Sequence, residues 1–326
     1  MNANKSKFIL FSLLITIGFL FSLDRTQAQI HQKSFEDKNI HCIYNLSNGM
    51  FNGQYKSFYK NGKIKASGKF ADNSRNGIWT LWSKDGKILV KRDYSNNYEY
   101  KQIFPVNIKN SNYLGERDSN GTIKDFDVKE QMIAQSQRIW RFITINNNDF
   151  LFKNNYLGNL LMNMVLKSKT IAYDAINDEF TKPYSIEELT NKYDFNKIEI
   201  IAYKIKEIWF FDNVRKISES RIIGICPVAV YRLDTSKQFD LFWLYYPDIR
   251  ANLAKEKLNF ALPNIKNLDD VFFFRYFSSK IYKEDNVYNK EIKDYKNGNE
   301  IDVEAERIML NLFESEHDFW LEFSKK

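Results

Sequence analysis

Three runs rich in β-branched and aromatic residues lie close together in the chain, at 198–211, 221–231 and 239–246. Each has the length of a strand, and short polar segments separate them, which is the pattern of neighbouring strands in a sheet. Pro227 and Pro247 occur where such a ladder would loosen or stop, because proline donates no backbone hydrogen bond. We therefore expect a buried sheet around which the rest of the chain folds.

The amino-terminal residues have the composition of an export signal. Lys5 and Lys7 form a short basic start, an apolar run covers 8–23, and the small residue Ala28 precedes Gln29. A membrane anchor is the alternative, but the run is shorter than the roughly 20 residues that span a bilayer. Residues 1–28 are therefore predicted to be a signal peptide, and no later segment is expected to cross a membrane as a helix.

Charge and cysteine content narrow the classes of function. The net charge of +7 is spread over many lysines, whereas nucleic-acid binding requires clustered charge. In an exported protein Cys42 and Cys226 would meet an oxidising compartment and could form a disulfide. The alternative is one buried thiol at Cys226 and one exposed thiol at Cys42. With only three histidines, a histidine-rich metal site is not expected.

An internal repeat with a spacing of 24 residues occupies 49–95. The segment 52–55, Asn-Gly-Gln-Tyr, matches 76–79, Asn-Gly-Ile-Trp, and the turn sequence Asn61-Gly62 matches Asp85-Gly86. Asn-Gly and Asp-Gly favour tight hairpin turns, so each repeat is predicted to be a β-hairpin. The pattern resembles the MORN-type repeat. It is either a structural β-meander or a surface that contacts lipid or protein through Tyr55, Phe58, Trp79 and Trp82.

The rest of the chain predicts a second domain of mixed structure. Residues 106–131 are polar and rich in turn formers, so a linker is expected between 29–105 and 132–326. An apolar stripe predicts a helix over 156–167, and Ser185 with Glu188 forms a capping box. Asp248 is expected to cap a helix that reaches Leu258, and a final helix is predicted over 303–323. The fold class is therefore α+β, with a mostly antiparallel sheet, flanking helices and a preceding hairpin segment.

Two groups of ionisable residues are candidates for chemistry, and neither has the right spacing. On a helix, residues 316–318 point in different directions and cannot converge on one ion, so a surface or interdomain contact is expected for Glu314, Glu316, His317 and Asp318. The second group lacks the glycine bend of a calcium loop and is predicted to be solvated: Asp174, Asp178 and Glu179. No nucleophile elbow or phosphate loop occurs in the sequence, so no enzyme activity and no cofactor is expected.

Five ordered segments of the second domain resemble the GldN/PorN family. They are I-K-E-I-W-F-F-D at 205–212, R-I-I-G-I-C-P-V at 221–228, L-F-W-L-Y-Y-P-D-I-R at 241–250, R-Y-F-S-S-K-I-Y-K-E-D-N-V-Y at 275–288 and E-H-D-F-W at 316–320. The resemblance covers roughly 135–326. It implies a non-enzymatic, periplasmic scaffold subunit of the type IX secretion and gliding motility machinery of Bacteroidetes.

The same resemblance implies particular partners. The family associates with an outer-membrane lipoprotein, GldK/PorK-like, within a ring in which this chain would be present in several copies. The alternative function is an exported repeat protein that binds lipid or another envelope protein. Because Tyr, Trp and Arg dominate protein interfaces, seven residues are candidate partner contacts, with burial in the core or in ion pairs equally expected: Trp209, Arg221, Trp243, Tyr246, Arg250, Arg275 and Trp320.

Overall fold

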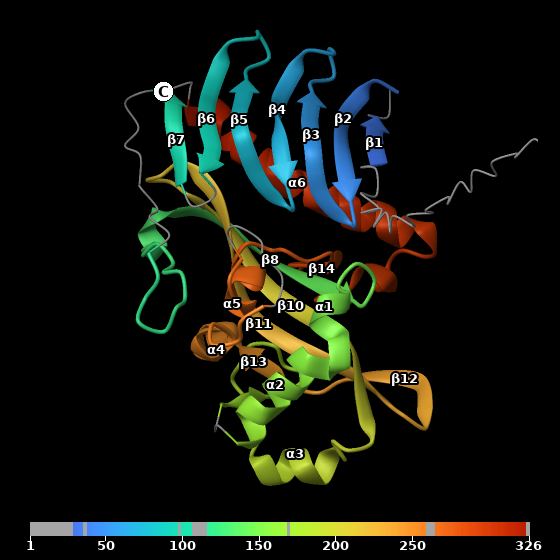
Figure 1. Cartoon of the computed structure of the whole chain (residues 1–326). Helices are drawn as coiled ribbons and strands as arrows, with labels where there is room; N and C mark the ends of the chain where they lie inside the picture. The colour runs from blue at the N-terminus through green and yellow to red at the C-terminus, as the bar shows by residue number, and fades with distance from the viewer. Residues whose placement is uncertain are drawn as a thin grey trace, which may run out of the picture.

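The computed structural model describes residues 29–34, 38–96, 99–105, 116–167, 170–258 and 265–323. The predicted signal peptide lies outside the described residues. Two seven-stranded antiparallel sheets are joined by a long C-terminal helix, α6 (Asn299–Phe323), which runs behind the N-terminal sheet in Figure 1. The predicted α+β class is confirmed. Within these residues, none of the helices combines the length and hydrophobicity that a bilayer crossing requires.

The N-terminal sheet is a meander whose strands follow chain order. Its strands are β1 (Gln29–Ser34), β2 (Ile40–Ser47), β3 (Met50–Phe58), β4 (Ile64–Ala71), β5 (Ser74–Trp82), β6 (Ile88–Asn96) and β7 (Glu99–Phe104). The repeat is visible in its turns, because the amide of Tyr59 donates to Lys63 at 2.8 Å and that of Ser83 donates to Lys87 at 2.8 Å. Gly62 and Gly86 adopt the positive φ that these turns need. The predicted hairpins are confirmed.

One face of this meander packs on α6. Tyr55 stacks on Trp79 with ring centroids 5.6 Å apart, and both contact a cluster that includes Phe313 and Trp320 of α6. Gly68 lies under the indole of Trp79, where a Cβ atom would overlap the ring. An isolated meander would leave this aromatic face in water, so α6 completes the core of the N-terminal sheet.

The C-terminal sheet has the strand order β14-β8-β10-β11-β13-β9, with β12 also paired to β11. Its strands are β8 (Ile133–Thr144), β9 (Ala172–Tyr173), β10 (Ile198–Asp212), β11 (Ile217–Tyr231), β12 (Asp234–Asp240), β13 (Trp243–Tyr245) and β14 (Lys280–Glu284). The single strand predicted over 239–246 is wrong, because β12 and β13 pair with different parts of β11. The break falls beside Pro227, which has no N–H to donate and accepts from Leu241 instead.

Short helices cover this second sheet. They are α1 (Asp149–Phe152), α2 (Tyr156–Leu166), α3 (Ile186–Lys192), α4 (Tyr246–Leu253) and α5 (Leu268–Phe273). The predicted helix at 156–167 and the Ser185 capping box are confirmed. The predicted cap at Asp248 is wrong, because α4 begins at Tyr246 with Pro247 in its first turn and ends at Leu253, short of Leu258.

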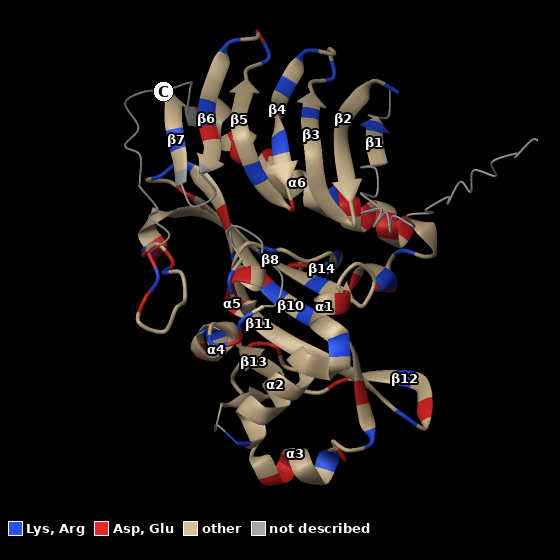
Figure 2. Ribbon diagram, viewed as in Figure 1, with Lys and Arg blue, Asp and Glu red and all other residues tan. Residues whose placement is uncertain are grey.

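The two sheets share α6 as a common layer. Ile308 and Leu312 pack against Ile139 and Ile281 of the C-terminal sheet, while Leu310 and Trp320 pack against the N-terminal sheet. Figure 2 shows basic segments along the N-terminal strands and acidic segments along α6. Because α6 has apolar contacts on two sides, it packs against both sheets at once.

Candidate binding site at the junction of the two sheets

The chain between α5 and β14 lies against the turns of the N-terminal sheet. We call residues 275–280, with the sequence R-Y-F-S-S-K, the junction segment. The side-chain amide of Asn73 donates to the carbonyl oxygens of Arg275 and Phe277, at 3.0 Å each. A Cβ atom on Gly49 would overlap the Ser278 hydroxyl, so the β2–β3 turn also approaches this segment closely.

Arg275 belongs to a buried cluster with more positive than negative charge. Glu207 is fully buried and accepts hydrogen bonds from Arg141 Nε, Trp209 Nε1 and Arg275 Nη1, each at 2.6 Å. Two guanidinium groups therefore share one carboxylate. Burial lowers the pKa of Arg141 to about 9, and burial together with the charge of Arg141 lowers the pKa of Arg275.

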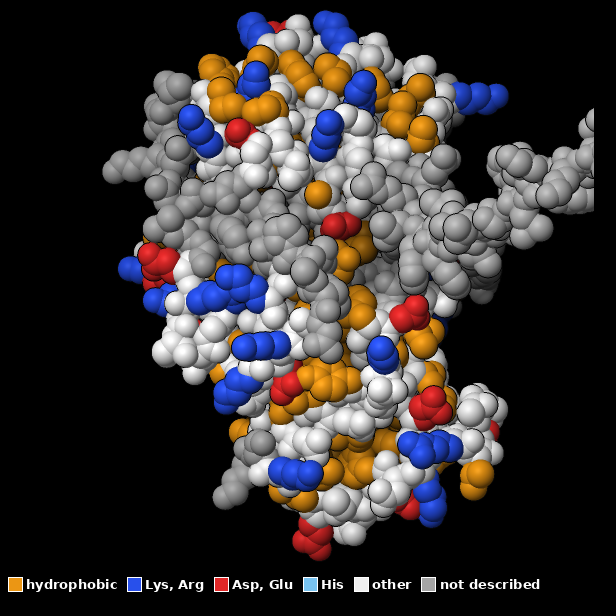
Figure 3. Space-filling model, viewed as in Figure 1, with side chains coloured by type: hydrophobic (Ala, Val, Ile, Leu, Met, Phe, Trp, Pro, Cys, Tyr) orange, Lys and Arg blue, Asp and Glu red, His pale blue; other side chains and the backbone are white. Residues whose placement is uncertain are grey.

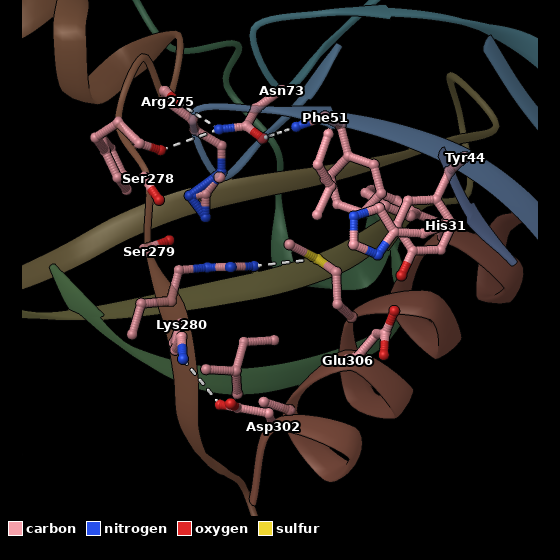
Figure 4. A pocket seen from close by; sticks show the side chains of 18 of the residues that line it. His31, Tyr44, Phe51, Asn73, Arg275, Ser278, Ser279, Lys280, Asp302 and Glu306 are labelled. Atoms are coloured by element: carbon pink, nitrogen blue, oxygen red, sulfur yellow. Dashed lines mark hydrogen bonds and ion pairs between the residues drawn. The ribbon is translucent and has the colours of Figure 1, made fainter. Parts of the chain in front are cut away.

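This cluster opens into a cavity of about 380 Å³ between the two sheets and α6. Figure 4 shows Arg275 on one side of the cavity and Tyr44, His31 and Phe51 on the other. Most of the lining surface is apolar, and five charged side chains and two serine hydroxyl groups also line the cavity. Cavities of this size and composition are typical of small-ligand sites.

Arg275 also lines a second cavity, of about 460 Å³. Four further arginines line it, and each has a carboxylate partner: Arg75 with Glu316, Arg215 with Asp212, Arg221 with Glu219 and Arg250 with Asp269. Arg75 shares Glu316 with Arg92, but Asp125 also lines this cavity and gives Arg250 a second carboxylate. The charges of these arginines are compensated within the described residues. The second cavity is therefore less suited to an anion than the first.

The acidic cluster of α6 links the helix to the N-terminal sheet, as the interdomain interpretation predicted. Glu314 accepts from His41 at 2.6 Å and Lys65 at 2.9 Å, and Glu316 accepts from Arg75 and Arg92 at 2.7 Å each. Burial opposes ionisation of Glu314, but the hydrogen bond from His41 and the charge of Lys65 outweigh it and lower its pKa.

His317 is also fixed by this sheet rather than by an ion. Its Nε2 atom lies 2.7 Å from the carbonyl oxygen of Trp82 and 3.0 Å from the Tyr59 hydroxyl. Asp318, by contrast, is exposed. In the part of the chain that the structure describes, no three His, Cys, Asp or Glu side chains are arranged to hold a metal ion.

The predicted contact residues are occupied inside the chain. Trp243, Tyr246 and Trp320 are at most 5 % exposed. The other four make internal bonds: Trp209 and Arg275 with Glu207, Arg221 with Glu219, and Arg250 with Asp269. Among the repeat aromatics, Tyr55 and Trp79 are buried against α6, while Phe58 and Trp82 are half-buried. Core packing and ion pairs therefore account for most of these side chains.

Two expectations about charge and thiols are corrected. Asp178 and Glu179 are not simply solvated, because both lie 3.1 Å from the ammonium of Lys206, which projects from the middle of β10 and is buried. A buried lysine such as Lys206, within an apolar strand, needs a carboxylate nearby, and the preceding loop supplies two.

Cys42 and Cys226 are both buried and free, so neither the disulfide nor an exposed Cys42 is found.

Sequence reasoning missed the residues that matter most at the junction. Glu207 and Arg141 interrupt apolar strand sequences, I-K-E-I-W and R-I-W-R-F, and a charge at such a position has to find a partner. The sequence therefore indicates that Glu207 needs a cationic partner, but it does not indicate Arg275, which is distant in sequence. The same holds for Asp269 of α5, which accepts from Arg250 and Tyr246 of α4.

Comparison with known proteins agrees with the architecture. The model of the family described as gliding motility associated protein GldN matches residues 128–321, well over half of the chain. This range holds the whole C-terminal sheet and nearly all of α6, and it begins after the repeats, whose likeness to MORN stays a prediction. No curated protein matches the chain. The chain belongs to the family of gliding motility associated protein GldN.

Proposed function

We propose that this protein is a non-enzymatic, periplasmic scaffold subunit of the type IX secretion and gliding motility machinery. It would associate with an outer-membrane lipoprotein of the GldK/PorK type, in a ring that holds several copies of the chain. The family match over residues 128–321 is the observation that carries this proposal.

The pairing of buried carboxylates with arginines supports a structural role for this protein. Glu207, Glu316 and Asp269 are at most 1 % exposed, and each neutralises an arginine. Hydrogen bonds from arginine side chains hold these carboxylates in place inside the protein. These groups are therefore suited to holding structural elements together.

Contacts to a partner require exposed side chains, and the second domain has two such residues side by side. Val287 is 97 % exposed and Tyr288 is 81 % exposed, in the loop that follows β14. Large apolar side chains in water are favourable candidates for burial by a partner. We propose them as contacts to the partner in addition to the seven candidates named from the sequence.

An affinity pull-down of the tagged chain from its own cell envelope tests the proposal, with mass spectrometry and sizing of the recovered material. We expect a lipoprotein of the GldK/PorK type in a very large assembly. Recovery of a monomer without that partner would refute the scaffold role. Val287→Asp with Tyr288→Asp should release the partner, whereas Ile176→Asp, at a position that is 92 % exposed elsewhere on the same domain, should retain it.

A second candidate function is binding of lipid or another envelope protein by the repeats. It is favoured by the outer face of the N-terminal sheet, where Lys56, Lys69 and Ile78 are exposed and where Figure 3 shows basic and apolar side chains together. Deleting the repeats would not test this role cleanly, because the face of α6 that carries Trp320 would be uncovered. Lys56→Glu with Lys69→Glu keeps the core. Loss of the lipoprotein with this variant would favour the second candidate.

A further inference from the structure

We propose that the cavity at the junction of the two sheets binds a small monoanionic amphiphile, a carboxylate attached to an apolar body. The carboxylate would lie against Arg141 and Arg275, and the apolar body would lie between the β2–β3 region and α6. This site goes beyond the scaffold role and does not depend on it.

The first argument is the charge balance of the lining. Lys280 is paired with Asp302 at 3.0 Å, and Glu306 is paired with Lys33. Arg141 and Arg275 have only Glu207 between them among the described residues, so the cavity has one positive charge in excess. A monoanion would balance this charge, whereas a dianion such as a phosphomonoester would reverse it.

The second argument is that one nitrogen of a buried guanidinium group has only a weak hydrogen-bond acceptor. Arg141 is 3 % exposed, and among the residues that the structure describes its Nη2 atom reaches only the thioether sulfur of Met309, at 3.5 Å. A thioether is a weak acceptor, and a guanidinium group prefers a carboxylate that accepts two parallel hydrogen bonds. Although Arg141 Nε donates to Glu207, a buried Nη2 group with only a weak acceptor is unfavourable, and a bound carboxylate would supply a better one.

The third argument is the apolar wall that faces the two arginines. Tyr44, Phe51, Phe313, Met309 and Phe277 all line the cavity. Its volume of about 380 Å³ leaves room for a medium-length alkyl chain or an aromatic ring beside the carboxylate. Inorganic anions would satisfy the arginines but would leave this wall without a partner.

Calorimetric titration and thermal unfolding of the mature chain with octanoate test the proposal, with octanol and inorganic phosphate as comparison probes. We expect saturable binding of octanoate and a rise in Tm, because a ligand of the folded state stabilises it. Octanol should bind on the order of tenfold more weakly, the loss expected when a charged hydrogen bond is absent. Equal binding of octanoate and octanol, or saturable binding of phosphate alone, would refute an amphiphilic carboxylate site.

Variants separate the charge from the fold. Arg275→Met leaves Arg141 and Glu207 as a balanced pair, so the protein should remain folded while octanoate binding falls about tenfold. Arg275→Lys should retain much of the affinity. Arg221→Met removes an arginine that lines the other cavity and serves as the matched control. If Arg275→Met does not fold, Ala305→Leu narrows the cavity from α6 without altering a charge, and unchanged octanoate affinity in that variant would overturn the proposal.

Discussion

Replacing Glu316 by glutamine should be one of the most damaging single changes in the molecule. Its carboxylate is 1 % exposed and accepts from Arg75 Nη1 and Arg92 Nη1, at 2.7 Å each. Arg92 is equally buried and lies over the rings of Tyr100 and Trp320. Glu316→Gln keeps the shape of the side chain but leaves two guanidinium groups without their anion.

The size of the effect follows from this burial. Removing one partner of a buried ion pair typically costs about 3–5 kcal/mol, because the remaining charge is left without compensation. The total stability of a domain is only about 5–15 kcal/mol, so this loss should be visible in any unfolding assay. Asp318 provides a control two residues away, since its side chain is 66 % exposed and 3.6 Å from Lys65. Asp318→Asn should cost less than about 1 kcal/mol.

Urea unfolding of a chain that begins at Gln29, followed by tryptophan fluorescence and far-UV circular dichroism, measures both variants. A double-mutant cycle with Arg92→Met adds the pairwise term. Arg92→Met with Glu316→Gln should be more stable than the sum of the single losses predicts, because one of the two uncompensated guanidinium groups, that of Arg92, is absent. A Glu316→Gln variant as stable as Asp318→Asn, or simple additivity in the cycle, would refute the view that this ion pair fastens α6 to the N-terminal sheet.

Three further outcomes are expected. Because the folded-state pKa of Glu314 is lowered, its contribution to stability is present above a pH of about 4.5 and disappears as the pH falls through its folded pKa. The difference in unfolding free energy between wild type and Glu314→Gln should therefore disappear in acid, and a difference that does not depend on pH would contradict this. Gly68→Ala should lower stability by roughly 1–3 kcal/mol by crowding Trp79, measured by thermal unfolding against Ser67→Ala beside it. Burial raises the pKa of Cys42 to about 12 and raises that of Cys226, so neither thiol should react with a maleimide until the protein is unfolded; rapid labelling of the native protein would argue otherwise.

The sequence was sufficient for much of the fold because its local signals are strong. The turn dipeptides at Asn61 and Asp85 specify the hairpins, and the leucine stripe specifies α2. The α4 boundary was misplaced because Pro247 is as favourable in the first turn of a helix as it is beyond the end of a strand. Local propensity cannot decide between the two.

The candidate site could not be predicted in the same way. Arg141, Glu207 and Arg275 come from two strands and a connecting segment, and no spacing rule links them. Their partnership depends on strand order, which brings β8 beside β10, and on the turn after α5. The aromatic content predicts an interface, because composition alone does not reveal that α6 is packed on two sides.

The position of α6 also has a consequence for how the protein folds. His41 and Glu314 are 273 positions apart, so this bond can form only after almost the whole chain has been made. The N-terminal sheet is synthesised first, but α6, which covers one of its faces, is synthesised last. Contacts of such long range slow folding and leave the early hairpins with an exposed aromatic face. Chains that lack the last helix should therefore accumulate as aggregation-prone intermediates, even though every strand of both sheets is present.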